Sequence, residues 1–248
     1  MKAPQSDFEE IAKSKQFDGA GTETAIVIGG APHVADMDLH PLAGITSIAS
    51  NCFLRHPYFK PHYLMLSDRR PYIRENEAGR LARHAEDLRI LLSITMFDPA
   101  VKCHGSPIQT RPPWRWFPWK VYGSVKAHNF DTFGKPLCSC ATIGGPMVQA
   151  AAIMGAKRIG IVGIDMYAPK QGSMHFYKET HPYEGRSTAT IQRDGTTMGP
   201  PKAMQRLADM KRELEARGVE VLNLSPNKGT PFAKAFGNYP YAKFVKGL

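Results

Sequence analysis

The sequence from Ala141 to Tyr177, ATIGGPMVQAAAIMGAKRIGIVGIDMYAPKQGSMHFY, contains one helix, turn and strand followed by a polar loop. Small and apolar residues from Pro146 to Met154 predict a helix that packs closely on a sheet, and Gly155 suits the left-handed residue that ends it. The run from Arg158 to Val162 is short, apolar and rich in β-branched residues, which is typical of a central parallel strand. This stretch predicts an α/β fold.

Polar side chains follow this strand directly. Asp165 and Tyr167 stand at its carboxyl end, and His175 comes a few residues later. In open α/β sheets, ligands bind outside the carboxyl ends of the strands, so these three residues are candidate catalytic residues by position. His175 has the side chain whose ordinary pKa best suits a general base that activates an acceptor hydroxyl.

The remainder of the chain repeats this alternation of strands and helices. Further strands are predicted at 24–28, 45–49, 62–66, 89–97 and 219–224, and further helices at 75–88 and 201–216. A chain of 248 residues that is 42% hydrophobic can bury the core of one such domain. We therefore expect a single domain over residues 22–248, with a mostly parallel sheet covered by helices on both faces. Residues 1–21 are polar and are expected to form a flexible arm or one short helix.

The first predicted strand runs straight into Gly29, Gly30, Ala31, Pro32 and His33. Two glycines allow the backbone to approach a ligand closely with free N–H groups, which suits a phosphate or a ribose. A tight turn between strand and loop would need the same glycines. The position after the first strand favours the ligand-binding interpretation.

Two long segments interrupt the pattern. The first, at about 101–136, holds all three tryptophans within RPPWRWFPWK, and its rings either stack on a sugar or nucleobase or pack against the sheet. The second, at about 168–200, is polar and is predicted to be a binding loop or lid.

Charge and cysteine content set limits on the partners and the compartment. The net charge of +10 arises from 32 Lys and Arg against 22 Asp and Glu, spread along the chain, and it attracts phosphorylated substrates or polyanions. The N-terminus has no apolar signal region and no window is long enough to span a membrane, so we expect a soluble cytoplasmic protein. Cys138 and Cys140 are separated by one residue rather than the two of common zinc or redox motifs, which favours reduced, partly buried thiols.

Several segments together resemble the bacterial sialyltransferases that build lipooligosaccharide caps. These are IVIGGAPHVADMDLHPL with SIASN, TIGGPMVQAAAIMGAKRIGIVGIDMY, and KAM with VEVLNLSPN. The resemblance covers roughly residues 24–227 and implies a Rossmann-like fold of the A-type glycosyltransferase variant. It also implies a nucleotide-activated sugar donor, a glycan acceptor or another hydroxyl acceptor, and no obligatory metal.

The same resemblance assigns roles to particular residues. Tyr167 matches a tyrosine that contacts the donor phosphate, and Asn51 matches a donor-binding asparagine. With the polar residues after strand 62–66 and at the start of the central helix, the expected donor-binding set is Gly29, Gly30, Ala31, Pro32, His33, Asn51, Ser67, Asp68, Thr142 and Gly144. The family's general-base histidine is absent here, because the matching segment reads Asp194-Gly195-Thr196-Thr197. The base is therefore expected to be His175 or Asp165. The family's arginine ahead of the central helix is also absent, since residues 138–142 stand there.

Two alternatives remain open. The HFY element at 175–177 is similar to hydroxymethylpterin diphosphokinase-like domains, found in bacterial glycan clusters and phages, which implies diphosphoryl transfer from ATP to a pterin-like alcohol. That reaction would need Mg²⁺, with Asp36, Asp38, Asp68 and Asp165 as possible ligands. The basic charge and the tryptophan segment also fit a nucleic-acid binder, or a transferase that decorates modified bases.

Overall fold

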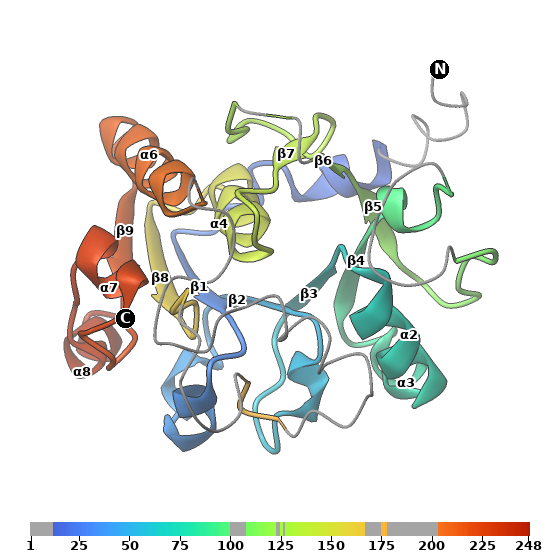
Figure 1. Cartoon of the computed structure of the whole chain (residues 1–248), viewed down its shortest axis with the longest axis horizontal. Coiled ribbons are helices and arrows are strands. Elements are labelled where there is room, and N and C mark those ends of the chain that lie inside the picture. The colour runs from blue at the N-terminus through green and yellow to red at the C-terminus, as the bar shows by residue number, and fades with distance from the viewer. Residues whose placement is uncertain (1–11, 100–107, 123–124, 126, 167–174, 178–202) are drawn as a thin grey trace.

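Seven parallel strands form the centre of the molecule, in the order β5-β4-β3-β2-β1-β8-β9 (Figure 1). The computed structural model describes residues 12–99, 108–122, 125, 127–166, 175–177 and 203–248. The strands are β1 (Thr24–Ile28), β2 (Thr46–Ser50), β3 (Tyr63–Leu66), β4 (Arg89–Ser93), β5 (Phe117–Trp119), β8 (Arg158–Val162) and β9 (Glu220–Asn223). Every pairing in this sheet is parallel, which confirms the predicted α/β class.

Helices cover both faces of the sheet. They are α2 (Arg69–Glu77), α3 (Arg80–His84), α4 (Gly144–Ile153), α6 (Ala203–Ala216), α7 (Pro231–Phe236) and α8 (Tyr241–Lys246). Along β1, Ala25 and Val27 join the core beneath α4 and α6, while Ile26 and Ile28 join the core on the other face with α3 and α8. This alternation follows from the two-residue repeat of a strand, and it makes the domain a three-layer sandwich.

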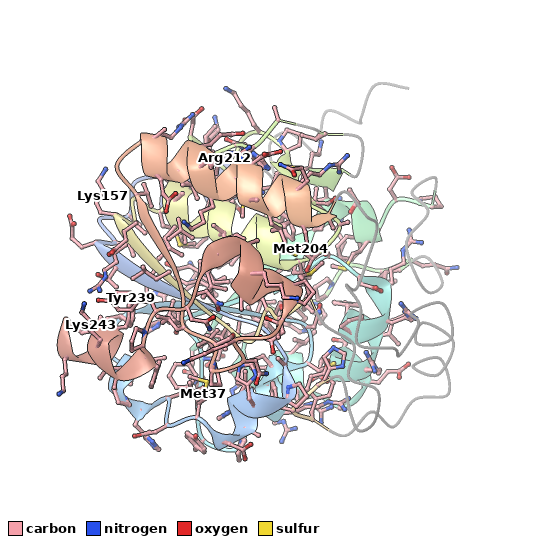
Figure 2. The ribbon with its side chains drawn as sticks, turned by 60° about the vertical axis from the view of Figure 1, so that its left-hand side comes forward. Met37, Lys157, Met204, Arg212, Tyr239 and Lys243 are labelled. Atoms are coloured by element: carbon pink, nitrogen blue, oxygen red, sulfur yellow. The ribbon has the colours of Figure 1, made fainter. Side chains whose placement is uncertain are left out.

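The two faces carry different helices in space. Figure 2 shows α6 lying across one side, with Met204 and Arg212 along it, and α8 with Lys243 at the opposite side. Met204 packs against the core of the α4 face, whereas Lys243 lies 5.2 Å from the centre of the Tyr239 ring. Within the described residues, no helix has the length and apolar character needed to cross a membrane.

Two predicted elements differ from the observed ones by more than two residues. The helix expected at 75–88 is two helices, because α2 begins earlier, at the Asp68 cap, and Gly79 takes a left-handed φ of 67° between α2 and α3. The strand expected at 89–97 ends at Ser93, whose hydroxyl lies 2.7 Å from that of Thr95 as the chain turns into η5 (Ile94–Met96).

Two irregular regions contribute to the core. The tryptophan segment supplies the edge strand β5, in which Trp119 is fully buried, so for this ring the packing interpretation is the correct one. Pro118 of β5 has no backbone N–H to donate, which suits an edge strand that pairs on one side only. Within the predicted arm, Ala12–Phe17 form a 3-10 helix, η1, and Phe17 packs edge-on against Phe117 and Tyr63. Residues 12–17 of the arm are therefore packed on the domain, which agrees with the short helix considered for this segment.

Candidate active site

The strand order changes direction at the centre of the sheet. From β1 the chain moves outward through β2, β3, β4 and β5, and it then returns to add β8 and β9 on the other side of β1. The carboxyl ends of β1 and β8 thus lie side by side at a topological switch point, where ligands bind in open α/β sheets.

The turns that leave β1 and β8 pack directly on each other. The backbone N–H of Gly29 donates to the Val162 carbonyl at 2.7 Å, and that of Ala31 donates to the Gly163 carbonyl at 3.1 Å. A Cβ atom on Gly29 would lie 2.2 Å from the Gly163 carbonyl oxygen. The glycine at position 29 is therefore required by this packing, the second of the two roles considered for the Gly29-Gly30 turn.

Three polar side chains converge at this switch point from three strand ends. The Nδ1 atom of His33, in η2 (Pro32–Asp36), lies 3.4 Å from Oδ2 of Asp165, which follows β8. The amide nitrogen of Asn227, beyond β9, donates to the same Oδ2 at 2.9 Å and lies 3.2 Å from His33 Nδ1. The first turn of α7 closes behind them, since the Phe232 N–H donates to the backbone carbonyl of Asp165 at 3.4 Å.

This cluster is largely withdrawn from solvent. The His33 and Asp165 side chains are 12% and 7% exposed. Burial alone would raise the pKa of Asp165, but hydrogen bonds from His33, Asn227 and Ser225 outweigh it and hold the pKa below its usual value. Asp165 is therefore ionised at neutral pH. Within the described part of the chain, His33 Nε2 and Asp165 Oδ1 are buried without a hydrogen-bond partner.

The segment 175–177 lies against the Gly30 turn. The backbone N–H of Phe176 donates to the Gly30 carbonyl at 2.9 Å, and a Cβ on Gly30 would lie 3.0 Å from His175 Cδ2. The His175 ring stacks on Tyr177 with the ring centres 4.8 Å apart, and the Arg55 guanidinium lies 5.3 Å from the Tyr177 ring centre. His175 thus contacts the loop after β1.

Solved structures with the same architecture were found by comparison, whereas no protein-family model and no curated protein matched the sequence. The sialyltransferase CstII from Campylobacter jejuni, in complex with cytidine-5'-monophosphate, has a TM-score of 0.50 at 13% identity, over 88% of this chain and 85% of that chain. A variant of CstII with the same nucleotide has a TM-score of 0.51 at 14% identity, over 88% and 87%. The α-2,3-sialyltransferase Cst-I from Campylobacter jejuni has a TM-score of 0.47 at 11% identity, over 88% and 80%.

The chain has a sialyltransferase-like fold. The fold prediction drawn from the sequence resemblance is thereby confirmed, and the comparisons give no diphosphokinase-like structure among those named. At this level of identity the likeness concerns the fold alone, so the roles of individual side chains depend on their geometry.

In this sialyltransferase-like fold, Asn51 follows β2 in a left-handed conformation with φ of 55°. Its backbone N–H donates to the Met65 carbonyl at 3.4 Å, and its side-chain oxygen is buried without a partner among the described residues. A buried acceptor in this state is suited to a ligand that brings a hydroxyl or amine donor.

Other residues of the expected donor-binding set have structural contacts. Asp68 caps α2 by accepting the Arg70 N–H at 2.9 Å, while Ser67 beside it is partly exposed. The Thr142 hydroxyl accepts the Gly144 N–H at 3.3 Å, and Gly144 is buried where a Cβ would lie 2.7 Å from the Ile164 side chain. Pro32 opens η2, and Tyr167 lies outside the described residues.

Sequence reasoning did not assign a role in the site to Asn227 or Ser225. Both stand at the polar exit of β9, and Ser225 accepts the Gly163 N–H at 3.1 Å. The signal was present, because Ser225-Pro226-Asn227 directly follows the predicted strand at 219–224. The convergence of His33 with Asp165 was equally unassigned, since His33 was expected only as part of the donor-binding loop.

Proposed function

We propose that this chain transfers a sugar from a nucleotide-activated donor to a hydroxyl acceptor, with the reaction at the carboxyl ends of β1 and β8. The buried cluster of His33, Asp165 and Asn227 at the switch point carries the proposal. It contains two buried polar atoms without partners in the described chain, an arrangement that costs free energy unless a ligand or water satisfies them. A fold shared with CMP-bound sialyltransferases supports a nucleotide donor.

The cluster has the composition of an acid–base pair. In glycosyl transfer, the acceptor oxygen bonds to the anomeric carbon as the bond from that carbon to the donor phosphate oxygen breaks, and the acceptor proton passes to a base. The tautomer of His33 that carries its proton on Nδ1 donates to the Asp165 carboxylate and leaves Nε2 able to accept that proton. Asp165 then acts by orienting His33, because a carboxylate with a lowered pKa is a weak base.

His175 is the second candidate for the base. Its ring lies against the Gly30 turn, and it was the candidate that the sequence favoured. Under this proposal the Gly29-Gly30 turn and Asn51 bind the nucleotide, and Tyr167 contacts the departing phosphate. Cationic side chains and backbone N–H groups neutralise the phosphate charge without an obligatory metal.

Three histidine variants separate these roles. Loss of the true base, in His33→Gln or His175→Gln, is expected to lower turnover about 10²- to 10⁴-fold with donor affinity nearly unchanged. The matched control is His62→Gln, since His62 lies at the amino end of β3, away from the carboxyl ends of the strands, and its Nδ1 atom lies 2.8 Å from the Ser47 hydroxyl. Turnover, donor affinity and melting temperature are measured for each variant. Full activity in both test variants would remove the acid–base assignment.

Donor binding is tested separately by thermal stability. A nucleotide that binds the folded chain raises its melting temperature in proportion to the logarithm of its concentration above Kd. Cytidine, uridine, guanosine and adenosine nucleotides are screened with and without Mg²⁺, and at least one is expected to stabilise the protein without the metal. If no nucleotide changes the melting temperature under either condition, the proposal of a nucleotide donor is wrong.

The comparison with and without Mg²⁺ also bears on the diphosphokinase alternative, which no contact among the described residues favours. Among the possible Mg²⁺ ligands, Asp68 caps α2. The Asp38 carboxylate accepts a hydrogen bond from the backbone N–H of His40 and lies 2.9 Å from its ring nitrogen Nδ1. Asp165 is held by His33 and Asn227. Release of AMP from ATP with a pterin alcohol, strictly dependent on Mg²⁺, would replace the glycosyltransferase proposal.

A further inference from the structure

A second group of reactive side chains lies at the start of α4, apart from the His33 cluster. It consists of His128, Cys138 at the end of β7 (Leu137–Cys138), and Cys140. A ring nitrogen of His128 and the two sulfur atoms all lie within 4.8 Å of one another, and the sulfurs are 3.7 Å apart. Both cysteines are fully buried, and the His128 side chain is 3% exposed.

The imidazole of His128 is held in one orientation. Its Nδ1 atom lies 3.0 Å from Oε1 of Glu213 on α6. Its Nε2 atom is buried and has no hydrogen-bond partner within the described residues. A histidine that ligates a metal usually donates one ring N–H to a carboxylate and binds the metal with its other ring nitrogen. His128 has this arrangement.

The two thiols are also placed by their surroundings. The side chain of Gln149 on α4 binds both backbone groups of Cys138, accepting its N–H at 3.0 Å and donating to its carbonyl at 2.8 Å. Cys140 takes a left-handed φ of 46° and packs on Gly145, where a Cβ would lie 2.8 Å from the Cys140 sulfur. The two sulfurs thereby face each other across a short turn.

We propose that His128, Cys138 and Cys140 bind a zinc ion. Two sulfurs and one imidazole are a zinc donor set, and Zn–S bonds of about 2.3 Å at a tetrahedral angle separate the sulfurs by about 3.8 Å, close to the separation observed. A Zn–N bond of about 2.0 Å would place the nitrogen about 3.5 Å from each sulfur, so the histidine nitrogen needs to approach by at most about 1.3 Å. The fourth position is left to water.

The position of the ligands would let the ion join separate parts of the fold. Between β5 and α4 the described chain has little regular structure, with only β6 (Val121–Tyr122) and β7 pairing over two residues each. A zinc ion would join this segment to the start of α4, and through Glu213 to α6. Metal binding then supplies folding free energy to a segment whose described residues make few backbone hydrogen bonds.

The site is tested on the full chain by metal content and by cobalt substitution. Protein expressed with zinc and purified without chelator is expected to contain about one zinc per chain. Cobalt added to the stripped protein is expected to give the intense visible bands of a tetrahedral ion and a near-ultraviolet thiolate charge-transfer band. Cys138→Ser and Cys140→Ser should lose both signals, while the control Cys52→Ser, at another buried cysteine, should keep them.

Glu213→Gln provides a graded variant, because loss of the carboxylate behind a histidine ligand weakens metal affinity about 10- to 100-fold. Wild-type protein without zinc and without cobalt bands would overturn the proposal, as would a Cys138→Ser/Cys140→Ser double variant that binds zinc like the wild type. A loss of two mass units on mild oxidation, with no metal bound beforehand, would show a redox dithiol instead. The wild-type cobalt titration decides the question even if the variants fail to fold.

This inference does not depend on the proposed function. A zinc-loaded protein that binds no nucleotide would refute only the glycosyltransferase proposal. A zinc-free protein that nucleotides stabilise would refute only the metal site.

Discussion

The packing of Gly29 against Gly163 gives a quantitative prediction for an added methyl group. In Gly29→Ala, the new Cβ would lie 2.2 Å from a backbone oxygen and 2.7 Å from a backbone carbon, neither of which can rotate away. The turns after β1 and β8 would have to separate by about 1 Å, and overpacking of this kind costs about 3 kcal/mol. For a chain of this size, that cost corresponds to a decrease in melting temperature of about 6–12 °C.

Gly30→Ala is the matched control, because it adds the same methyl group one residue later. Its nearest neighbour is a side-chain atom, Cδ2 of His175 at 3.0 Å, which can move. We expect a decrease in stability below about 1 kcal/mol, together with weaker nucleotide binding if the donor lies on this turn. Scanning calorimetry and urea unfolding measure both variants. Equal stability of Gly29→Ala and Gly30→Ala would refute the argument that position 29 is fixed by contact between the two turns.

Three further predictions concern buried polar groups. Gln149→Leu removes the amide that binds backbone groups of Asn129, Cys138 and Gly145, and it should cost about 3 kcal/mol in urea unfolding. A loss below about 1 kcal/mol would contradict the role assigned to this amide. Glu75→Gln removes the buried carboxylate that binds Arg80 at 2.5 Å and should cost about 2 kcal/mol, while the exposed ion pair of Asp87 should tolerate Asp87→Asn without measurable change. The pKa of Asp165 is lower in the folded chain than in the unfolded chain, so its contribution to stability is complete above the unfolded pKa of 3.8 and is lost as the pH falls below it. The melting temperature of Asp165→Asn should therefore fall less than that of the wild type below about pH 4, and parallel curves would contradict the assignment.

The central strands were predictable because they are buried on both faces. The predicted bounds of β1 and β8, 24–28 and 158–162, are those observed, since a doubly covered strand is a continuous apolar run. The bounds of β4 were less accurate, because apolar residues continue past Ser93 while the hydrogen bond to Thr95 turns the chain. β5 was not predicted at all, since its three residues Phe117, Pro118 and Trp119 give no alternating pattern.

Side-chain convergence was less predictable than the fold. The position of Asp165 at a strand end followed from the strand itself, but its contact with Asn227 depends on the turn before α7, where Thr230 binds the Asn227 carbonyl at 3.3 Å. The single residue between Cys138 and Cys140 argued against a metal site in the sequence. That spacing cannot show that His128 lies beside the two cysteines in the folded chain. Contacts of this kind are set by tertiary structure, which local patterns do not contain.

The adjacency of β1 and β8 has a consequence for synthesis of the chain. Thr24 pairs with Arg158, so one edge of β1 has no partner until β8 has emerged, long after β2 to β5 are available. Until then, the growing chain exposes an apolar strand edge that can pair with another chain. We expect the newly made amino-terminal half to need protection by chaperones, and the cluster of His33 and Asp165 to form only after that late pairing.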